Sequence, residues 1–190
     1  MIYERECTCF TRSYSQLEEF LLFGIAVAGK NANTTAHALE RLLTRLGFPE
    51  LAPFEAVRRG VRGHRLTPSV IRKCGLGCYN QRYQSFKEAA NSKVDLKICS
   101  ADELETIRGV GPKTARFFLL HSREGFRGAA LDTHILKYLR DNGVDRVPKS
   151  TPASGSGYRR LEQEFLKFVP EDMSVADFDL GVWKMYAKGR

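Results

Sequence analysis

The sequence predicts an all-α protein, and two kinds of signal support this fold class. Helix-start patterns recur along the chain, among them the capping box Ser100-Ala-Asp-Glu103 and the pair Thr67-Pro68, in which a cap residue precedes a first-turn proline. Apolar residues between these starts repeat at helical spacing, and no run alternates with the two-residue period of a strand. The pattern predicts about nine or ten helices.

The helices are predicted in chain order from these signals. Ser15-Gln-Leu-Glu18 has the form of a capping box and opens a strongly apolar helix that ends near Ala28. Gly29–Asn33 then interrupts the chain. Turn-rich residues 144–157 form a linker before the last helices. Further helices are predicted over residues 34–46, 49–62, 68–73, 113–120, 133–140, 158–168 and 175–186.

A tight hairpin is predicted at Gly109-Val-Gly111. The two glycines let the backbone turn sharply and expose successive N–H groups, and Pro112 suits the first turn of a new helix. Free amides beside a helix N-terminus bind phosphate oxygens, so the hairpin indicates a clamp for a nucleic-acid backbone. Lys113 lies in that first turn, where the helix dipole disfavours an ammonium ion. A neutral lysine can attack an electrophilic carbon and form a Schiff base.

Asp132 is the second candidate for chemistry. It follows Lys113 after one helix and one loop, and it is predicted to cap the helix that starts at Thr133. Backbone N–H groups at a helix start favour the charged form of a carboxylate. The sequence therefore predicts an amine and a carboxylate at two neighbouring helix starts.

The segments Gly109-Val-Gly-Pro-Lys-Thr-Ala115 and Leu131-Asp-Thr-His134 resemble the motif of the helix-hairpin-helix DNA glycosylase superfamily, which contains endonuclease III and the 8-oxoguanine DNA glycosylases. The chain is similar above all to small archaeal-type 8-oxoguanine DNA glycosylase/AP lyases. The resemblance implies that Lys113 is the Schiff-base nucleophile and Asp132 the essential carboxylate. It also implies DNA contacts by the following hairpin and helix residues: Gly109, Gly111, Thr114 and His134. A helix-surface role is the alternative for the histidine.

The same resemblance implies a two-lobed helix-hairpin-helix DNA glycosylase fold. Residues 29–128 would form a central helical bundle that ends in the hairpin. Residues 1–28 and 129–190 would form a second helical lobe, and the DNA-binding cleft would lie between the two lobes.

The stretch Gly75-Leu-Gly-Cys-Tyr-Asn-Gln-Arg-Tyr83 resembles the loop that these glycosylases insert into DNA beside an extruded base. By this resemblance Cys78 or Tyr79 is the wedge and Arg82 contacts the partner strand. Tyr79 also fits the core face of a helix, so both interpretations stay open for it.

Five further residues are candidates, each with a structural alternative: four by resemblance, and Phe117 because it lies one turn past Lys113 on the same helix face. Lys30 and Asn31 fall where the family places a polar residue that fills the gap in the duplex, and a solvated turn is their alternative. Phe117, Asp179 and Trp183 are candidates for the base pocket, with core packing of their helices as the alternative.

Composition agrees with a nucleic-acid partner. The 190 residues carry a formal net charge of +8, which favours a polyanion, although a basic surface alone is a weak signal. The sequence shows neither a secretory segment nor an apolar run long enough to span a membrane, so we expect an intracellular monomer that works with DNA. The five cysteines lack usual zinc spacing and none follows Cys99, so we expect no metal and no iron–sulfur cluster.

The function that these observations predict is a bifunctional DNA glycosylase/AP lyase of base excision repair. It would flip out and excise an oxidised base, in the first place 8-oxoguanine, from double-stranded DNA. Two alternatives stay open: a glycosylase for oxidised pyrimidines, and a non-catalytic helix-hairpin-helix DNA-binding protein.

Overall fold

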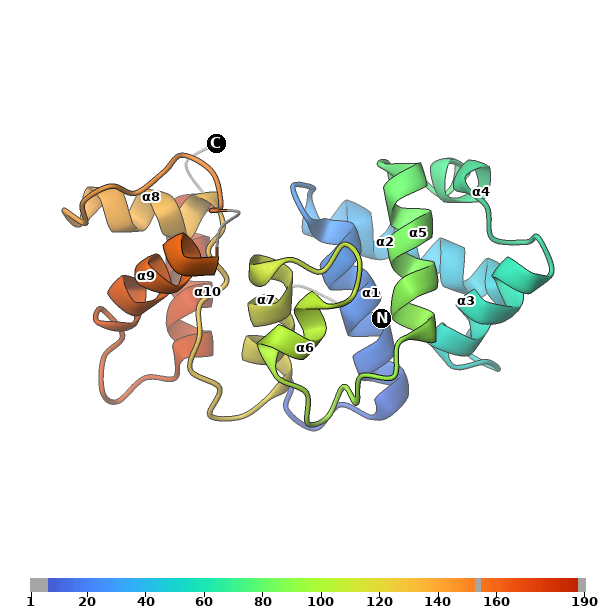
Figure 1. Cartoon of the computed structure of the whole chain (residues 1–190), viewed down its shortest axis with the longest axis horizontal. Helices are drawn as coiled ribbons and strands as arrows, with labels where there is room; N and C mark the ends of the chain where they lie inside the picture. The colour runs from blue at the N-terminus through green and yellow to red at the C-terminus, as the bar shows by residue number, and fades with distance from the viewer. Residues whose placement is uncertain (1–6, 153–154, 188–190) are drawn as a thin grey trace. The chain divides into compact units, whose positions relative to one another are not determined.

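The computed structural model describes residues 7–152 and 155–187, and within these ranges it contains ten α-helices and no strand (Figure 1). The predicted all-α fold class is confirmed. The helices are α1 (Tyr14–Val27), α2 (Ala32–Leu46), α3 (Pro53–Arg62), α4 (Pro68–Lys73), α5 (Tyr79–Asn91), α6 (Ala101–Glu105), α7 (Pro112–Ser122), α8 (Thr133–Asp141), α9 (Gly155–Leu166) and α10 (Val175–Ala187).

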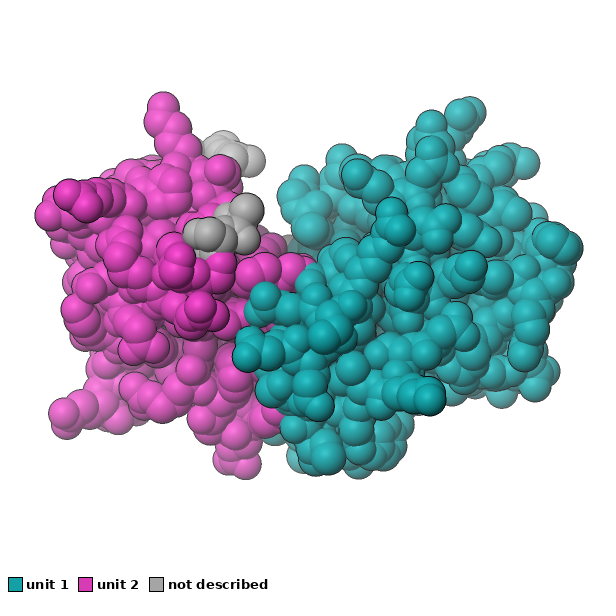
Figure 2. Space-filling view, in the orientation of Figure 1, with its two compact units in different colours: residues 1–110 teal, residues 111–190 magenta. Residues whose placement is uncertain are grey.

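The chain divides into two compact units, Met1–Val110 and Gly111–Arg190 (Figure 2). This grouping differs from the predicted division into residues 29–128 and residues 1–28 with 129–190. The reason lies in α1, which packs against α2, α3 and α5 and so belongs to the first unit. The boundary also falls inside the hairpin, because Val110 is the last residue of the first unit and Gly111 is the first residue of the second.

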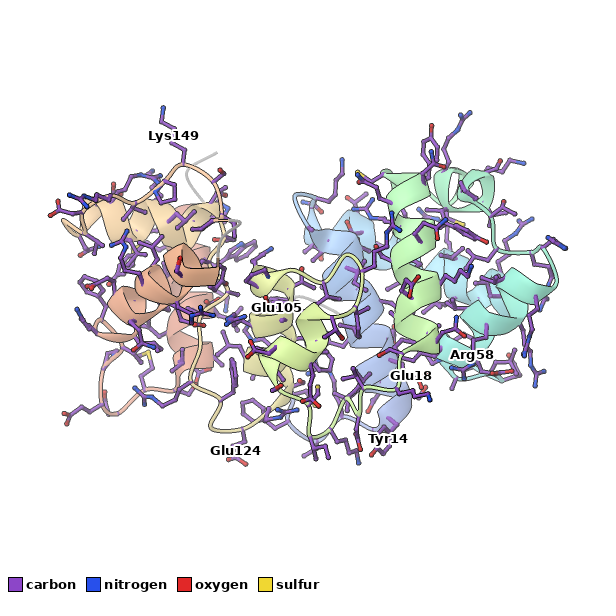
Figure 3. All side chains as sticks on the ribbon, viewed as in Figure 1. Tyr14, Glu18, Arg58, Glu105, Glu124 and Lys149 are labelled. Carbon is purple, nitrogen blue, oxygen red and sulfur yellow. The ribbon has the colours of Figure 1, made fainter. Side chains whose placement is uncertain are left out.

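In the first unit, α1 is the buried helix that the sequence predicts. Nine of its residues are buried, from Leu17 to Ala26. Its capping box is formed by Ser13 and Gln16, not by the predicted Ser15 and Glu18, since Ser13-Tyr-Ser-Gln16 fits the same pattern. The Glu18 carboxylate instead accepts the backbone N–H of Phe54 at 2.9 Å, which joins α1 to the start of α3 (Figure 3).

In the second unit, α8, α9 and α10 enclose an apolar core with α7 at its edge. Leu136, Leu139, Leu161 and Phe165 are buried there. Around it, the Tyr138 ring makes edge-on contacts with the rings of Phe165, Phe168, Phe178 and Tyr186. Helix α10 packs against both α7 and α8, and this packing brings the candidate site residues of the unit together.

A search of the described residues for membrane-spanning helices finds none of sufficient length and apolarity.

Candidate active site

The hairpin turns at Gly109, where the backbone has a conformation that favours glycine. Gly109 has a φ of +85°, a left-handed conformation that favours glycine. A Cβ atom at this position would also lie 2.0 Å from Oγ of Ser85 on α5. The backbone of residue 109 therefore approaches α5 more closely than any other residue type would permit.

Helix α7 starts with its amides uncovered. Gly111 is the N-cap residue and offers no capping side chain, and Pro112 follows at the first helical position. The first N–H groups of a helix have no partner within it, so those of Lys113 and Thr114 remain for a partner outside the helix, at the positive end of the dipole. Thr114 as a whole residue is only 6% exposed, so it offers little surface for the predicted DNA contact.

Asp132 caps α8, as the sequence predicts. Its Oδ1 atom accepts the backbone N–H groups of His134 at 2.8 Å and Ile135 at 2.9 Å. Both Lys113 and Asp132 are half-buried, so their side chains are partly shielded from water and partly reachable. A carboxylate fixed by two amides keeps one position, which is what stabilisation of a developing positive charge needs.

Asp179 of α10 connects the two candidates. Its side chain is 6% exposed, and within the described residues its Oδ1 atom has no hydrogen-bond partner. Burial, and next the charge of Asp132, raise the pKa of Asp179 to about 8, against the lowering effects of the Ala130 amide and of Lys113. Both Lys113 and Asp132 therefore lie near enough to Asp179 to influence its pKa, and their catalytic roles stay predictions.

Asp179→Asn is expected to stabilise the protein relative to wild type at pH 8 and to have little effect at pH 4. The unfolded chain loses the Asp179 proton near the ordinary value of 3.8, whereas the native state keeps it until about pH 8. Stability that the protonated carboxyl provides is therefore lost as pH rises through this window, at about 1.4 kcal/mol per pKa unit of the difference. Urea unfolding of both proteins across this pH range measures it, and a pH-independent difference would contradict the prediction.

A buried polar network holds the segment that leads to Asp132. The Tyr158 hydroxyl donates to the carbonyl of Ala129 at 2.7 Å and accepts the N–H of Leu131 at 2.9 Å. Glu162, one turn further along α9, accepts the N–H of Ala129 at 3.0 Å. Arg116 of α7 forms an ion pair with the same Glu162 oxygen, at 3.1 Å.

Sequence reasoning missed this network. Tyr158, Glu162 and Arg116 were given no role, although a signal for two of them exists in the sequence. Arg116 interrupts the apolar face that Phe118 and Leu119 continue, and Glu162 lies beside Leu161 on a predicted core face. Buried charges of opposite sign on two core faces indicate a pair, because a buried ion needs a partner.

Tyr158→Phe is expected to lower the free energy of unfolding by about 1–3 kcal/mol, because it removes two buried hydrogen bonds. The Ala129 carbonyl and the Leu131 N–H then keep only their bond to each other, at 3.1 Å. Tyr138→Phe is the matched control. The Tyr138 hydroxyl makes no hydrogen bond to any residue that the structure describes, so its loss should change stability little. Urea denaturation measures both, and equal effects of the two variants would show that the Tyr158 hydrogen bonds are not responsible.

The aromatic candidates of the second unit lie close to the site. Trp183 and His134 are both half-buried and meet edge to face, with ring centroids 6.0 Å apart. Phe117 is half-buried one turn beyond Lys113, and its ring meets that of His121 at 5.0 Å. The base-pocket roles of Phe117, Asp179 and Trp183, and the DNA contact of His134, stay predictions.

The candidates of the first unit lie at the starts of α5 and α2. Cys78 and Tyr79 are exposed, and Cys78 has a φ of +39° as the N-cap residue. Lys30 is exposed, and its Nζ atom would lie 3.9 Å from a Cβ atom on Gly77. Asn31 caps α2, since its side-chain oxygen accepts the N–H of Thr34 at 3.0 Å.

The structure does not place Arg82 for the predicted contact with the partner DNA strand. Its side chain is 4% exposed, and its guanidinium donates to the carbonyl of Ala26 at the end of α1. A buried guanidinium tied to the backbone of another helix is not placed to contact a DNA strand. The arginine has the spacing of a loop contact in the sequence, but the first turn of α5 directs it inward.

Comparison with known proteins gives a match among solved structures. Neither a scan of known protein families nor a search of curated proteins finds a match to the sequence. Among solved structures, the 8-oxoguanine DNA glycosylase of Thermotoga maritima matches with a TM-score of 0.67, over 93% of this chain and 81% of that one. The chain has a DNA glycosylase fold. The two sequences are 24% identical.

Lys113 and Asp132 have similar local settings in the second unit. Each lies at the start of a helix, α7 or α8, that packs against α10. An amine, a carboxylate fixed by two amides and the buried carboxyl group of Asp179 are thus found on helices, or helix caps, that contact one another.

Proposed function

We propose that the chain is a bifunctional DNA glycosylase/AP lyase that removes an oxidised base from double-stranded DNA, with 8-oxoguanine as the favoured base. The observation that carries this proposal is the common effect of Lys113 and Asp132 on buried Asp179, within a DNA glycosylase fold. A nucleophile and an ionic stabiliser at one site are the groups that cleavage of a glycosidic bond needs. The choice of 8-oxoguanine rests on the structural neighbour, which is an 8-oxoguanine DNA glycosylase, and on the resemblance of residues 75–83 to the loop that such glycosylases insert into DNA.

In the proposed reaction, the neutral amine of Lys113 attacks C1′ of the damaged nucleotide. The bond from C1′ to the base breaks, and its electron pair leaves with the base, which takes up a proton. The sugar ring then opens to give an imine between Lys113 and C1′. Loss of a proton from C2′ breaks the bond from C3′ to the phosphate oxygen, and the strand is nicked.

Asp132 has one of two roles in this scheme. Its carboxylate stabilises the positive charge that builds on the sugar as the base departs, or it accepts the proton that Lys113 must lose. Its two amide hydrogen bonds fix the carboxylate and favour the first role, since a fixed charge needs no reorganisation during the reaction.

DNA is the proposed partner, and the chain would act wherever that DNA lies. The uncovered amides of α7 would bind a backbone phosphate. Tyr79 has the exposure that a wedge needs, at 39%, and stacking of an aromatic ring offsets part of the cost of extruding a base. The protein would act as a monomer without a metal or an iron–sulfur cluster.

Borohydride trapping across a panel of duplexes tests this proposal. Reduction of the imine should link the chain covalently to an 8-oxoguanine duplex and leave an undamaged duplex of the same sequence unlinked. Trapping on thymine glycol but not on 8-oxoguanine would replace the proposed substrate with an oxidised pyrimidine. Salt-sensitive binding with no trapping on any lesion would favour a non-catalytic DNA-binding protein.

A further inference from the structure

A basic groove lies between α2 and the end of α4, in the first unit. Its volume is about 570 Å³, and it is lined by Glu40, Arg41 and Arg45 of α2 and by Val70, Lys73 and Cys74 of the α4 segment. None of these residues is among the candidates for catalysis or DNA contact named above. The groove therefore contains other residues than the site around Lys113 and Asp132.

The cations of the groove are available to a ligand. Arg41, Arg45 and Lys73 are exposed, and in the described part of the chain no carboxylate lies within 4.0 Å of their charged atoms. One nitrogen of Arg41 donates to the Cys74 carbonyl at 2.9 Å, which holds its guanidinium against α4. The single acid, Glu40, lies 3.7 Å from Nδ1 of His37 on the same helix. Three cations against one carboxylate leave a positive groove.

The arginines of α3 provide a contrast. Arg58, Arg59 and Arg62 all bond to the carboxylate of Glu55, at 2.9, 2.8 and 3.3 Å. That set is already neutralised in part within its own helix (Figure 3, Arg58). Within the residues that the structure describes, the same unit therefore contains one group of arginines paired with a carboxylate and one group of cations that no carboxylate pairs.

Beyond the groove, cations also lie beside the loop that precedes α5. A nitrogen of Arg41 would lie 3.5 Å from a Cβ atom on Gly75, and Nζ of Lys30 would lie 3.9 Å from one on Gly77. Both glycines have positive φ and no side chain, so the two cations lie close to the loop backbone. Positive charge therefore extends from Lys73 and Arg45, past Arg41, to Lys30.

We propose that this groove binds backbone phosphates of the DNA duplex, outside the nucleotide that is excised. The inference rests on the proposed function, and it adds a binding site that the function itself does not require. Phosphate contacts position a protein on a duplex and carry no sequence information. The groove should therefore set affinity and register on DNA, and leave the choice of damaged base unchanged.

The test compares two double variants that remove the same charge from the same unit. Arg45→Gln with Lys73→Gln empties the groove, and Arg59→Gln with Arg62→Gln removes arginines that Glu55 already pairs. Binding of an undamaged duplex is measured from low to high potassium chloride. The groove variant should lower the slope of log K against log salt by about 2, one for each lost phosphate contact, and the control variant by much less.

A second arm neutralises the DNA, one phosphate at a time. Single methylphosphonate linkages, placed in turn along the duplex, should weaken wild-type binding at particular positions and leave the groove variant unaffected at the same positions. Thermal unfolding of both double variants shows that they are folded in the comparison. Equal slopes for both double variants, or no methylphosphonate position that distinguishes the groove variant, would overturn the proposal.

The excision rate and the salt slope distinguish a failure of the groove proposal from a failure of the proposed function. Excision from a saturating amount of lesion duplex should proceed at the wild-type rate in the groove variant, because Lys113 and Asp132 are intact. A wild-type protein that shows the groove-dependent salt slope but excises no base would refute the enzyme and leave the groove. Normal excision with no groove-dependent slope would refute the groove and leave the enzyme.

Discussion

Lys113→Gln will abolish borohydride trapping and lower excision of the damaged base by at least about 10³-fold, the scale on which loss of a nucleophile acts. Glutamine keeps most of the length of the side chain at the start of α7 but cannot form an imine. The hairpin amides that would bind phosphate are backbone groups, so affinity for the duplex should stay near the wild-type value. Single-turnover excision and gel-shift titration measure the two quantities separately.

Lys149→Gln is the matched control for this variant. Lys149 is an exposed lysine in the same unit, and its replacement removes the same charge (Figure 3). Trapping and excision should be unchanged. If Lys113→Gln still traps on damaged DNA, another amine is the nucleophile and the proposed assignment fails.

Asp132→Asn should lower the rate of base excision by about 10²- to 10⁴-fold while the fold keeps its stability. Asparagine is an equally good N-cap residue, so its side-chain oxygen can still accept the amides of His134 and Ile135. What the variant loses is the negative charge, which is the part that acts on a developing positive sugar. Excision kinetics under single-turnover conditions and thermal unfolding measure the two effects.

The same variant gives an independent signal at Asp179. The charge of Asp132 helps to raise the pKa of Asp179 to about 8, so its removal should lower that pKa. Carbon-13 NMR of the Asp179 carboxyl group across a pH titration measures the shift. Asp145→Asn, an exposed loop substitution, should leave both excision and the titration unchanged. An unaltered Asp179 titration in Asp132→Asn would place the two carboxyl groups too far apart for the proposed site.

The local features of the candidate site could be predicted from the sequence because short-range rules decide them. Gly109 needs positive φ, Gly111 and Pro112 start α7, and Asp132 caps α8, and each of these follows from a few neighbouring residues. The same rules do not decide between two similar patterns two residues apart. The cap of α1 is Ser13, although Ser15 begins a pattern of the same form.

The tertiary features could not be predicted in this way. Arg82 looks like a surface contact in the sequence, but the packing of α5 on α1 brings its guanidinium to the carbonyl of Ala26. The contacts of Tyr158 with Ala129 and Leu131 span nearly thirty positions, so no local pattern contains them. The raised pKa of Asp179 likewise depends on burial and on a charge from another helix.

The boundary between the two compact units also divides the chemistry. Lys113, Asp132 and Asp179 all belong to residues 111–190, whereas Tyr79 and the groove cations belong to residues 1–110. Under the proposed function, extrusion of the base and cleavage of the sugar would thus be encoded in separate stretches of chain. A preformed abasic site offers no base to extrude, so nicking there should depend on the second stretch far more than removal of an intact lesion does.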